Sequence, residues 1–97
     1  MEVEKILEKI VNKYKDVKEA VAVTPDGFVV GFYPKEREES GVERISAMGA
    51  SLISLAQRMS KSFNDSDLKE IVLKTDKGNL IGYPLSDKLF VFVWVNH

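Results

Sequence analysis

Residues 89–95 read Leu-Phe-Val-Phe-Val-Trp-Val, and every position in this run is apolar. A strand with one face in water alternates apolar and polar residues, whereas a strand covered on both faces is apolar throughout. The run therefore predicts the central strand of a sheet, with other elements packed on both of its faces.

Two further strands are predicted immediately before this one. Residues 68–75 and 80–84 are strand-like, and turn residues fill the intervals 76–79 and 85–88. The strand at 68–75 carries lysine and glutamate along its length, which is typical of an edge strand protected from random pairing. The C-terminal part of the chain thus predicts a three-stranded meander that begins at a sheet edge.

A helix and a hairpin are predicted in the N-terminal third. Residues 2–15 place apolar side chains three and four apart, which is the spacing of an amphipathic helix. Two apolar runs follow at 17–24 and 28–33, and Pro25-Asp26-Gly27 between them is typical of a hairpin turn. Gly31 in the second run predicts a bulge or a close approach by another backbone.

A charged loop and a long helix join these two parts. Residues 34–40 form the loop, and Ser40 and Glu43 have the spacing of a capping box. The helix is expected over residues 41–63, with Asn64 as a left-handed stop. The order α-β-β-α-β-β-β predicts an α+β fold with one five-stranded antiparallel sheet and helices on its faces. The 97 residues fit one domain, residues 1–97.

The same periodicity predicts the core. Apolar residues that recur on one side of a helix or strand are expected to be buried against its neighbours. These residues are Ile6, Ile10, Val21, Val23, Val30, Ile45, Leu52, Ile53, Leu55, Ile71, Leu73, Val91 and Val93.

The long helix has two distinct sides. At 100° per residue, its large apolar residues share one broad side, which is expected to pack on the sheet. They are Val42, Ile45, Met48, Gly49, Leu52, Ile53, Leu55, Ala56, Met59 and Phe63. The opposite side carries small residues at its middle, and Arg58 and Lys61 further along. The small residues are Ala47, Ala50, Ser51 and Ser54.

Small residues allow two helix axes to approach closely, so this side could meet the same helix of a second copy across a two-fold axis. The alternative is that alanine and serine are merely tolerated on an exposed helix, where alanine is the best helix former. The edge strand at 68–75 could extend the sheet to the same second copy, or it could be a plain edge.

Composition argues against several classes of function. A net charge of −1 does not fit a general nucleic-acid binder, and the absence of cysteine excludes disulfides and cysteine-based zinc sites. The one histidine is His97, at the terminus. Because turn chemistry accounts for Asp26, Asp76 and Asp87, we expect no catalysis, metal or cofactor.

The cellular setting is predicted from the same composition. No run approaches the ~20 apolar residues that span a membrane, and the N-terminus is charged and amphipathic, unlike a secretion signal. We therefore expect a cytoplasmic protein without membrane insertion. Its glutamate and lysine content is typical of a thermophilic source.

The order of elements, the Asp26-Gly27 turn, the small-residue helix at 47–56 and the meander at 68–94 together resemble the roadblock / dynein light chain family, whose fold is profilin-like. The resemblance covers residues 3–95. It implies a homodimer or heterodimer formed through the second helix and third strand, with a continuous ten-stranded sheet. It also implies a non-catalytic regulator or scaffold of a small Ras-like GTPase, or a light chain of dynein.

By this resemblance the dimer contacts fall on particular residues, and Arg58 and Lys61 would bind the partner. The dimer contacts are Ala47, Ala50, Ser51, Ser54, Leu68, Ile71, Leu73 and Thr75. Some members carry a further helix after the last strand, whereas this sequence ends at His97. The face that such a helix would cover is then expected to be left to the first helix or to a partner.

A second function class remains open at this point. Sheet-and-helix folds of the PAS and GAF type bind small molecules in a pocket lined by polar groups. The nearly all-apolar core, which includes Phe90, Phe92 and Trp94, predicts a filled interior instead.

Overall fold

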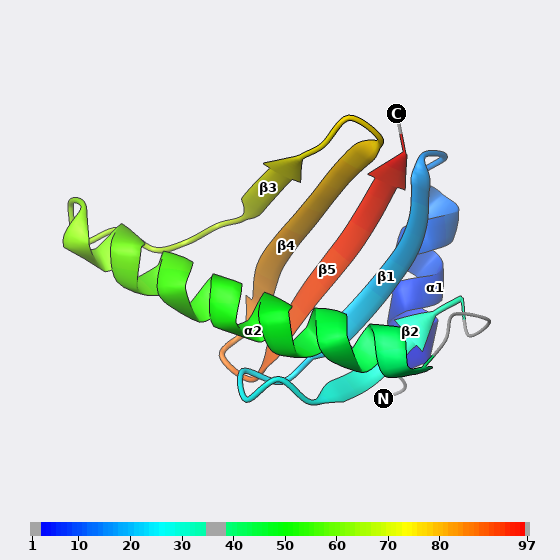
Figure 1. Cartoon of the computed structure of the whole chain (residues 1–97), viewed down its shortest axis with the longest axis horizontal. Coiled ribbons are helices and arrows are strands. Elements are labelled where there is room, and N and C mark those ends of the chain that lie inside the picture. Colours follow the sequence, from blue (N-terminus) through cyan, green and yellow to red (C-terminus); the bar gives the residue numbers. More distant parts are fainter. Residues whose placement is uncertain (1–2, 35–38, 97) are drawn as a thin grey trace.

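In residues 3–34 and 39–96, which are those described by the computed structural model, five antiparallel strands form one sheet in the spatial order β2-β1-β5-β4-β3 (Figure 1). The predicted α+β class and element order are confirmed. The elements are α1 (Val3–Lys13), β1 (Val17–Val23), β2 (Val29–Tyr33), α2 (Glu39–Ser62), β3 (Ile71–Lys74), β4 (Gly78–Ser86) and β5 (Leu89–Asn96).

The all-apolar strand β5 is central, as predicted. It pairs with β1 on one side and with β4 on the other, with Ala22 opposite Val91 and Gly82 opposite Phe92. The two sheet edges are β2 and β3. β3 is an edge strand as predicted, but it is shorter than the expected 68–75 because only residues 71–74 pair with β4.

The hairpin turn between β1 and β2 is present where the sequence predicts it. Gly27 has a positive φ angle of 96°, and its amide donates to the Thr24 carbonyl at 2.9 Å. The Phe28 amide donates to the Thr24 hydroxyl at 3.1 Å. Glycine is needed here because other side chains rarely adopt this backbone conformation.

The turn between β3 and β4 is tighter than the sequence suggested. The Thr75 hydroxyl accepts hydrogen bonds from the amides of Lys77 and Gly78 at 3.2 and 3.1 Å, and donates one to the Gly78 carbonyl at 2.6 Å. β4 therefore begins at Gly78, two residues earlier than predicted.

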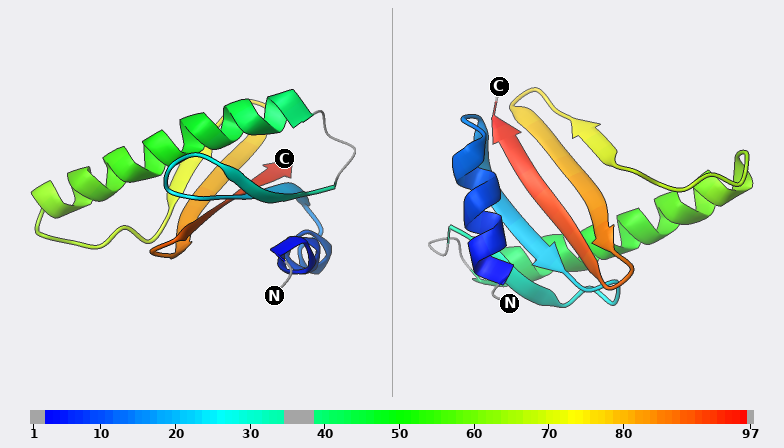
Figure 2. Two further views of the ribbon diagram at one scale, coloured as in Figure 1. Left: turned by 90° about the horizontal axis from the view of Figure 1, so that it is seen from below. Right: turned by 180° about the vertical axis from the view of Figure 1, so that it is seen from behind.

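The two helices cover opposite faces of the sheet (Figure 2). α1 contacts β1 and β2, and Leu7 is its fully buried anchor. A Cβ atom at Gly31 would lie 3.0 Å from Glu4 Oε2, so this glycine makes room for α1. The approaching group is therefore a helix side chain and not the backbone that was predicted. The pairing with β1 is irregular beside this glycine, because Ala22 lies opposite Gly31 and Val23 opposite Val29. Val30 is thus an extra residue of β2, which confirms the predicted bulge.

On the other face, the ring of Phe92 determines how closely α2 approaches the sheet. A Cβ atom at Gly49 of α2 would lie 2.5 Å from Phe92 Cε2, and a Cβ atom at Gly82 of β4 would lie 2.5 Å from Phe92 Cε1. Real Cβ contacts are not this short, so the Phe92 ring occupies the space that both glycines leave. α2 consequently packs directly onto β5.

The predicted core is confirmed in part. Three of the expected core residues, Val30, Leu55 and Leu73, are exposed. Val30 and Leu73 lie on the two edge strands, and Leu55 points away from the sheet. The residues that are buried as predicted are Val21, Val23, Ile53, Val91 and Val93. Those that are half-buried are Ile6, Ile10, Ile45, Leu52 and Ile71.

The C-terminal end of α2 is closed by several polar contacts. Asn64 and Asp65 have positive φ angles of 65° and 48°, which confirms the left-handed stop at Asn64. The Ser66 amide and hydroxyl donate to the Ser60 carbonyl at 3.0 and 2.7 Å. Lys61 Nζ donates to Asp67 Oδ1 at 2.8 Å. These contacts fix the position of the last helical turn.

The N-terminal start of α2 differs from the prediction. The helix begins at Glu39, so Ser40 is already helical and does not occupy the capping position. The Ser40 side chain, and residues 35–38 of the predicted charged loop, lie outside the described residues.

We expect Gly49→Ala to lower the free energy of unfolding by about 1–3 kcal/mol, because the added methyl overlaps the Phe92 ring. Helix propensity alone predicts that the substitution raises the free energy of unfolding, since alanine is favoured over glycine in a helix by roughly 1 kcal/mol. Urea unfolding measures the change. The control is Ser51→Ala on the exposed side of the same helix, expected within about 0.5 kcal/mol of wild type. A stabilised Gly49→Ala protein would contradict the packing described for Phe92.

The pKa of Asp67 is lowered from its ordinary value of 3.8, first by the hydrogen bond from Lys61 and then by the Lys61 charge. The stabilisation from this ion pair is therefore present above pH 3.8 and is lost as the pH falls through the lower folded pKa. We expect Lys61→Met to raise the Asp67 pKa measured by carboxyl NMR. The more weakly acting Lys69 provides the control, and Lys69→Met should raise the Asp67 pKa less. An equal rise of the Asp67 pKa in both variants would exclude a specific hydrogen bond between Lys61 and Asp67.

Candidate functional site

The side of α2 that faces the sheet is rotated about the helix axis from the one predicted, so that prediction is confirmed only in part. Val42, Gly49 and Ile53 are buried as predicted, and Ser46 and Ala50 are buried beside them. Large apolar residues expected on the sheet are exposed instead, and Met48 is 59% exposed. Leu55, Met59 and Phe63 are exposed in the same way.

The physical reason lies in the sheet. Phe90 and Phe92 of β5 project toward α2, and they pack with Val42, Ala50 and Ile53 in one buried cluster. Large side chains on both surfaces would hold the helix away from the sheet, so the helix presents its small residues. The sequence held a signal for this, because Ser46, Gly49 and Ala50 already form a small-residue stripe one turn long.

The four small residues predicted at a helix–helix interface are separated by the fold. Ala47 and Ser51 are exposed, and Ser54 is half-buried. Ala50 is 3% exposed and packs in the core cluster, so its predicted place on the outer side is wrong. An Ala50 side chain enclosed by its own sheet cannot also contact a second helix.

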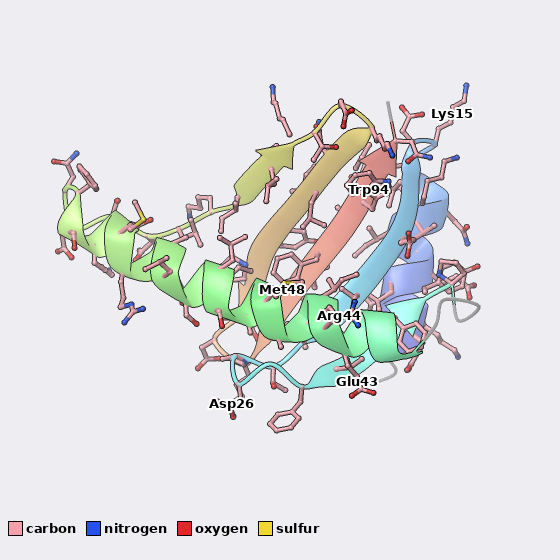
Figure 3. The ribbon with its side chains drawn as sticks, in the orientation of Figure 1. Lys15, Asp26, Glu43, Arg44, Met48 and Trp94 are labelled. Atoms are coloured by element: carbon pink, nitrogen blue, oxygen red, sulfur yellow. The ribbon has the colours of Figure 1, made fainter. Side chains whose placement is uncertain are left out.

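The outer side of α2 carries a shallow apolar depression. It is lined by Ala47, Met48, Ser51, Leu52 and Leu55, which we call the outer α2 surface. Met48 lies at its centre on the outward side of the helix (Figure 3). Methionine and leucine exposed together on a helix are typical of a surface that a partner covers.

The β3 edge adds to this surface in a different way from the one predicted. Leu68 and Ile71 pack against the core, and Thr75 shapes the turn to β4. The exposed apolar side chains of β3 are Val72 and Leu73. Among the described residues β3 pairs only with β4, so the backbone of its outer edge is open to a further strand.

α2 extends beyond this open edge. Figure 1 shows the C-terminal half of the helix passing β3 and continuing outside the sheet. Among residues 54–62 of α2 none is buried, which agrees with the lack of sheet beneath them. We call residues 55–63 the overhang. It extends beyond the β3 side of the sheet (Figure 1), and its residues Leu55, Met59 and Phe63 are exposed.

The two basic residues predicted to bind a partner differ in availability. Arg58 is exposed on the overhang. Lys61 is also exposed, but its ammonium group pairs with Asp67 at 2.8 Å and with Asp65 at 3.8 Å. Lys61 therefore serves first to close the helix end.

A second feature is a half-open cavity of about 360 Å³ on the α2 face of the sheet. α2 crosses the sheet diagonally and leaves one corner uncovered, and Trp94 marks this corner beyond the helix in Figure 3. The prediction of a filled interior is therefore wrong at this corner of the sheet. The lining includes Val42 and Ile45 of α2, Glu19 and Val21 of β1, Phe32 of β2, Leu80 of β4, and Phe92 and Trp94 of β5.

Two further properties concern the described residues alone. Within residues 3–34 and 39–96, no three histidine, cysteine or acidic side chains are grouped so that they could hold a metal ion. Over the same ranges, no helix combines the length and apolar character needed to cross a membrane.

Comparison with known proteins places this geometry in a family. The Roadblock/LC7 domain family matches residues 3–94. No curated protein matches the chain in sequence.

Several solved structures share the fold at low identity. A Roadblock/LC7 domain from Streptomyces avermitilis is similar with a TM-score of 0.89 and 18% identity, over 99% of this chain and 79% of that one. The gliding protein MglB from Thermus thermophilus follows at 0.80 and 13%, over 96% and 70%. An MglB structure with a tetrameric arrangement gives 0.81 and 14%, over 96% and 69%. The match over nearly the whole chain shows that this protein belongs to the Roadblock/LC7 domain family.

Proposed function

We propose that this chain is a non-catalytic, cytoplasmic, homodimeric regulator or scaffold of a small Ras-like GTPase, with residues 1–97 acting as one domain. The observation that carries the proposal is the overhang of α2 beside the open edge of β3. A helix that leaves its own sheet with Leu55 and Met59 exposed is suited to pack against a second molecule.

The dimer geometry follows from strand pairing. When a β3 edge pairs in antiparallel fashion with its own copy, the two-fold axis is perpendicular to the sheet. Both α2 helices then lie on the same face, and each overhang extends above the partner's β3. The two five-stranded sheets would join into ten strands, and the outer α2 surfaces would be partly covered.

The comparisons support assembly in a general sense. One MglB structure has a tetrameric arrangement, and this chain has the same fold at 14% identity. The GTPase partner is inferred from the resemblance of this sequence to the roadblock / dynein light chain family. Among the described residues Arg58 makes no ion pair, in contrast to Lys61 on the same overhang. We therefore propose Arg58 as a contact to the GTPase.

Two other roles are weaker. A dynein-type light chain would use the same α2 and β3 surfaces, and no feature of the described residues favours it over a GTPase regulator. A sensor of polar metabolites requires a polar-lined pocket, whereas Glu19 is the one charged residue in the described lining of the cavity.

We expect the wild-type protein to be a dimer and Leu55→Glu to be a monomer, because the substitution places a charge in the proposed interface. Light scattering measures the mass, and circular dichroism checks that the variant is folded. Phe28→Glu is the control, since Phe28 is also apolar and exposed but lies beside β2 at the far edge. It should remain dimeric. A monomeric wild-type protein at high concentration would refute the dimer.

We expect Arg58→Glu to weaken binding to a Ras-like GTPase by at least about tenfold while leaving the dimer intact, because the charge reversal repels an acidic partner surface. Titration calorimetry with GTPases from the same source measures the affinity. Lys88→Glu, in the turn between β4 and β5, carries the same charge change away from α2 and should bind as wild type. If no Ras-like GTPase binds the wild-type dimer, the proposed partner class is wrong.

A further inference from the structure

We propose that the cavity beside α2 is completed by a second copy of this chain, with Phe63 from the overhang of one protomer entering over Trp94 of the other. The inference rests on the homodimer proposed above and adds a reciprocal anchor on the sheet face, separate from strand pairing at β3.

The cavity has the properties of an unfilled part of a core. Its walls are mostly apolar and include the rings of Phe32, Phe92 and Trp94, while Glu19 and Tyr33 also line it. The Trp94 indole is held in place, because its Nε1 donates to Asn96 Oδ1 at 2.7 Å. Apolar walls that stay open to water forgo the stabilisation of burial, which an apolar group entering the cavity would recover.

The overhang presents a matching group. Phe63 is 70% exposed and Met59 lies one turn before it, also exposed. The segment is ordered by contacts of its own, since Ser66 donates to the carbonyls of Ser60 and Phe63 and Lys61 bonds Asp67. The backbone that carries the aromatic ring is thus held in place, which reduces the entropy cost of docking it.

The reach of the overhang agrees with the position of the cavity. From Leu55 to Phe63 the helix rises about 12 Å, at roughly 1.5 Å per residue. Neighbouring strands are about 4.8 Å apart, so this length crosses about two to three strands of the partner, counted inward from β3. Leu80 lies on the second of these strands and Trp94 on the third.

The face is also the correct one. With a two-fold axis perpendicular to the sheet, the partner's overhang lies on the face that carries α2. The cavity opens on this same face, because Val42 and Ile45 of α2 form one of its walls.

The strand register leads from the open edge to the cavity. Leu73 of β3 lies opposite Leu80 of β4, and Leu80 lies opposite Trp94 of β5. Trp94 also lies at the end of β5 that α2 leaves uncovered (Figure 3). A helix that enters across β3 at Leu73 would therefore pass over Leu80 and reach Trp94 without meeting the α2 helix of the same protomer.

Trp94 is the sole tryptophan of the chain, so its fluorescence reports on the cavity directly. We expect the wild-type emission maximum to shift to longer wavelength as dilution separates the dimer. In Phe63→Ser, a protein that is still dimeric by light scattering should show the long-wavelength emission and stronger quenching by acrylamide. Phe28→Ser is the matched control, because Phe28 is also 70% exposed. It should behave as wild type.

A second measurement covers the case in which Phe63→Ser is monomeric. The chain has no cysteine, so Phe63→Cys combined with Leu80→Cys places the only thiols at the two positions that are proposed to meet between protomers. Mild oxidation should convert this variant to a covalent dimer, and Phe28→Cys with Leu80→Cys should stay uncrosslinked.

The outcomes separate the two proposals. A wild-type monomer would refute the homodimer and this inference together. A Phe63→Ser dimer with wild-type Trp94 emission, or absence of the Phe63–Leu80 cross-link in a dimer, would overturn the cavity contact alone. An added apolar dye gives a further comparison. If the dye changes Trp94 emission equally in the wild-type dimer and in the Phe63→Ser dimer, Phe63 does not occupy the cavity. The cavity would then be a small-molecule site, and the second-copy occupant would be excluded.

Discussion

The packing of Phe92 between two glycines is the constraint on which the rest of this structure depends. Gly49 lies on α2 and Gly82 on β4, and neither position has room for a Cβ atom beside the ring. The ring thus brings the helix down onto the central strand. Because the contact surface must be small, the helix turns Ser46, Gly49 and Ala50 toward the sheet.

The character of the outer surface is a consequence of that close contact. A helix whose small residues face inward must present its larger residues elsewhere, and here Met48, Leu55 and Met59 point outward. A short apolar helix face in water is costly for a protein of this size, which has a limited core. The last turns of the same helix pass the open β3 edge (Figure 1). An outward apolar face, an overhang and a free edge therefore occur together.

The diagonal crossing also explains the cavity. α2 lies over β2, β1, β5 and β4 and leaves the corner around Trp94 without a helix above it (Figure 3). On the opposite face α1 covers β1 and β2. Each face of the five-stranded sheet thus has one helix, whereas a second helix from another molecule could complete the α2 face. The proposed homodimer and the proposed Phe63 contact both use this incomplete layer.

The sequence alone determined the order of the elements, the central place of β5, the edge position of β3 and the turn at Gly27, because these follow from local periodicity and from backbone conformations that few residues adopt. It also predicted that the long helix would carry an interaction surface, which is part of the function proposed above. Only the tertiary structure decided which side of that helix faces the sheet. Both sides are apolar or small, so the hydrophobic pattern does not distinguish them. The packing of Phe92 against Gly49 determines which side faces the sheet. These two residues are far apart in the chain, so local sequence does not reveal their contact.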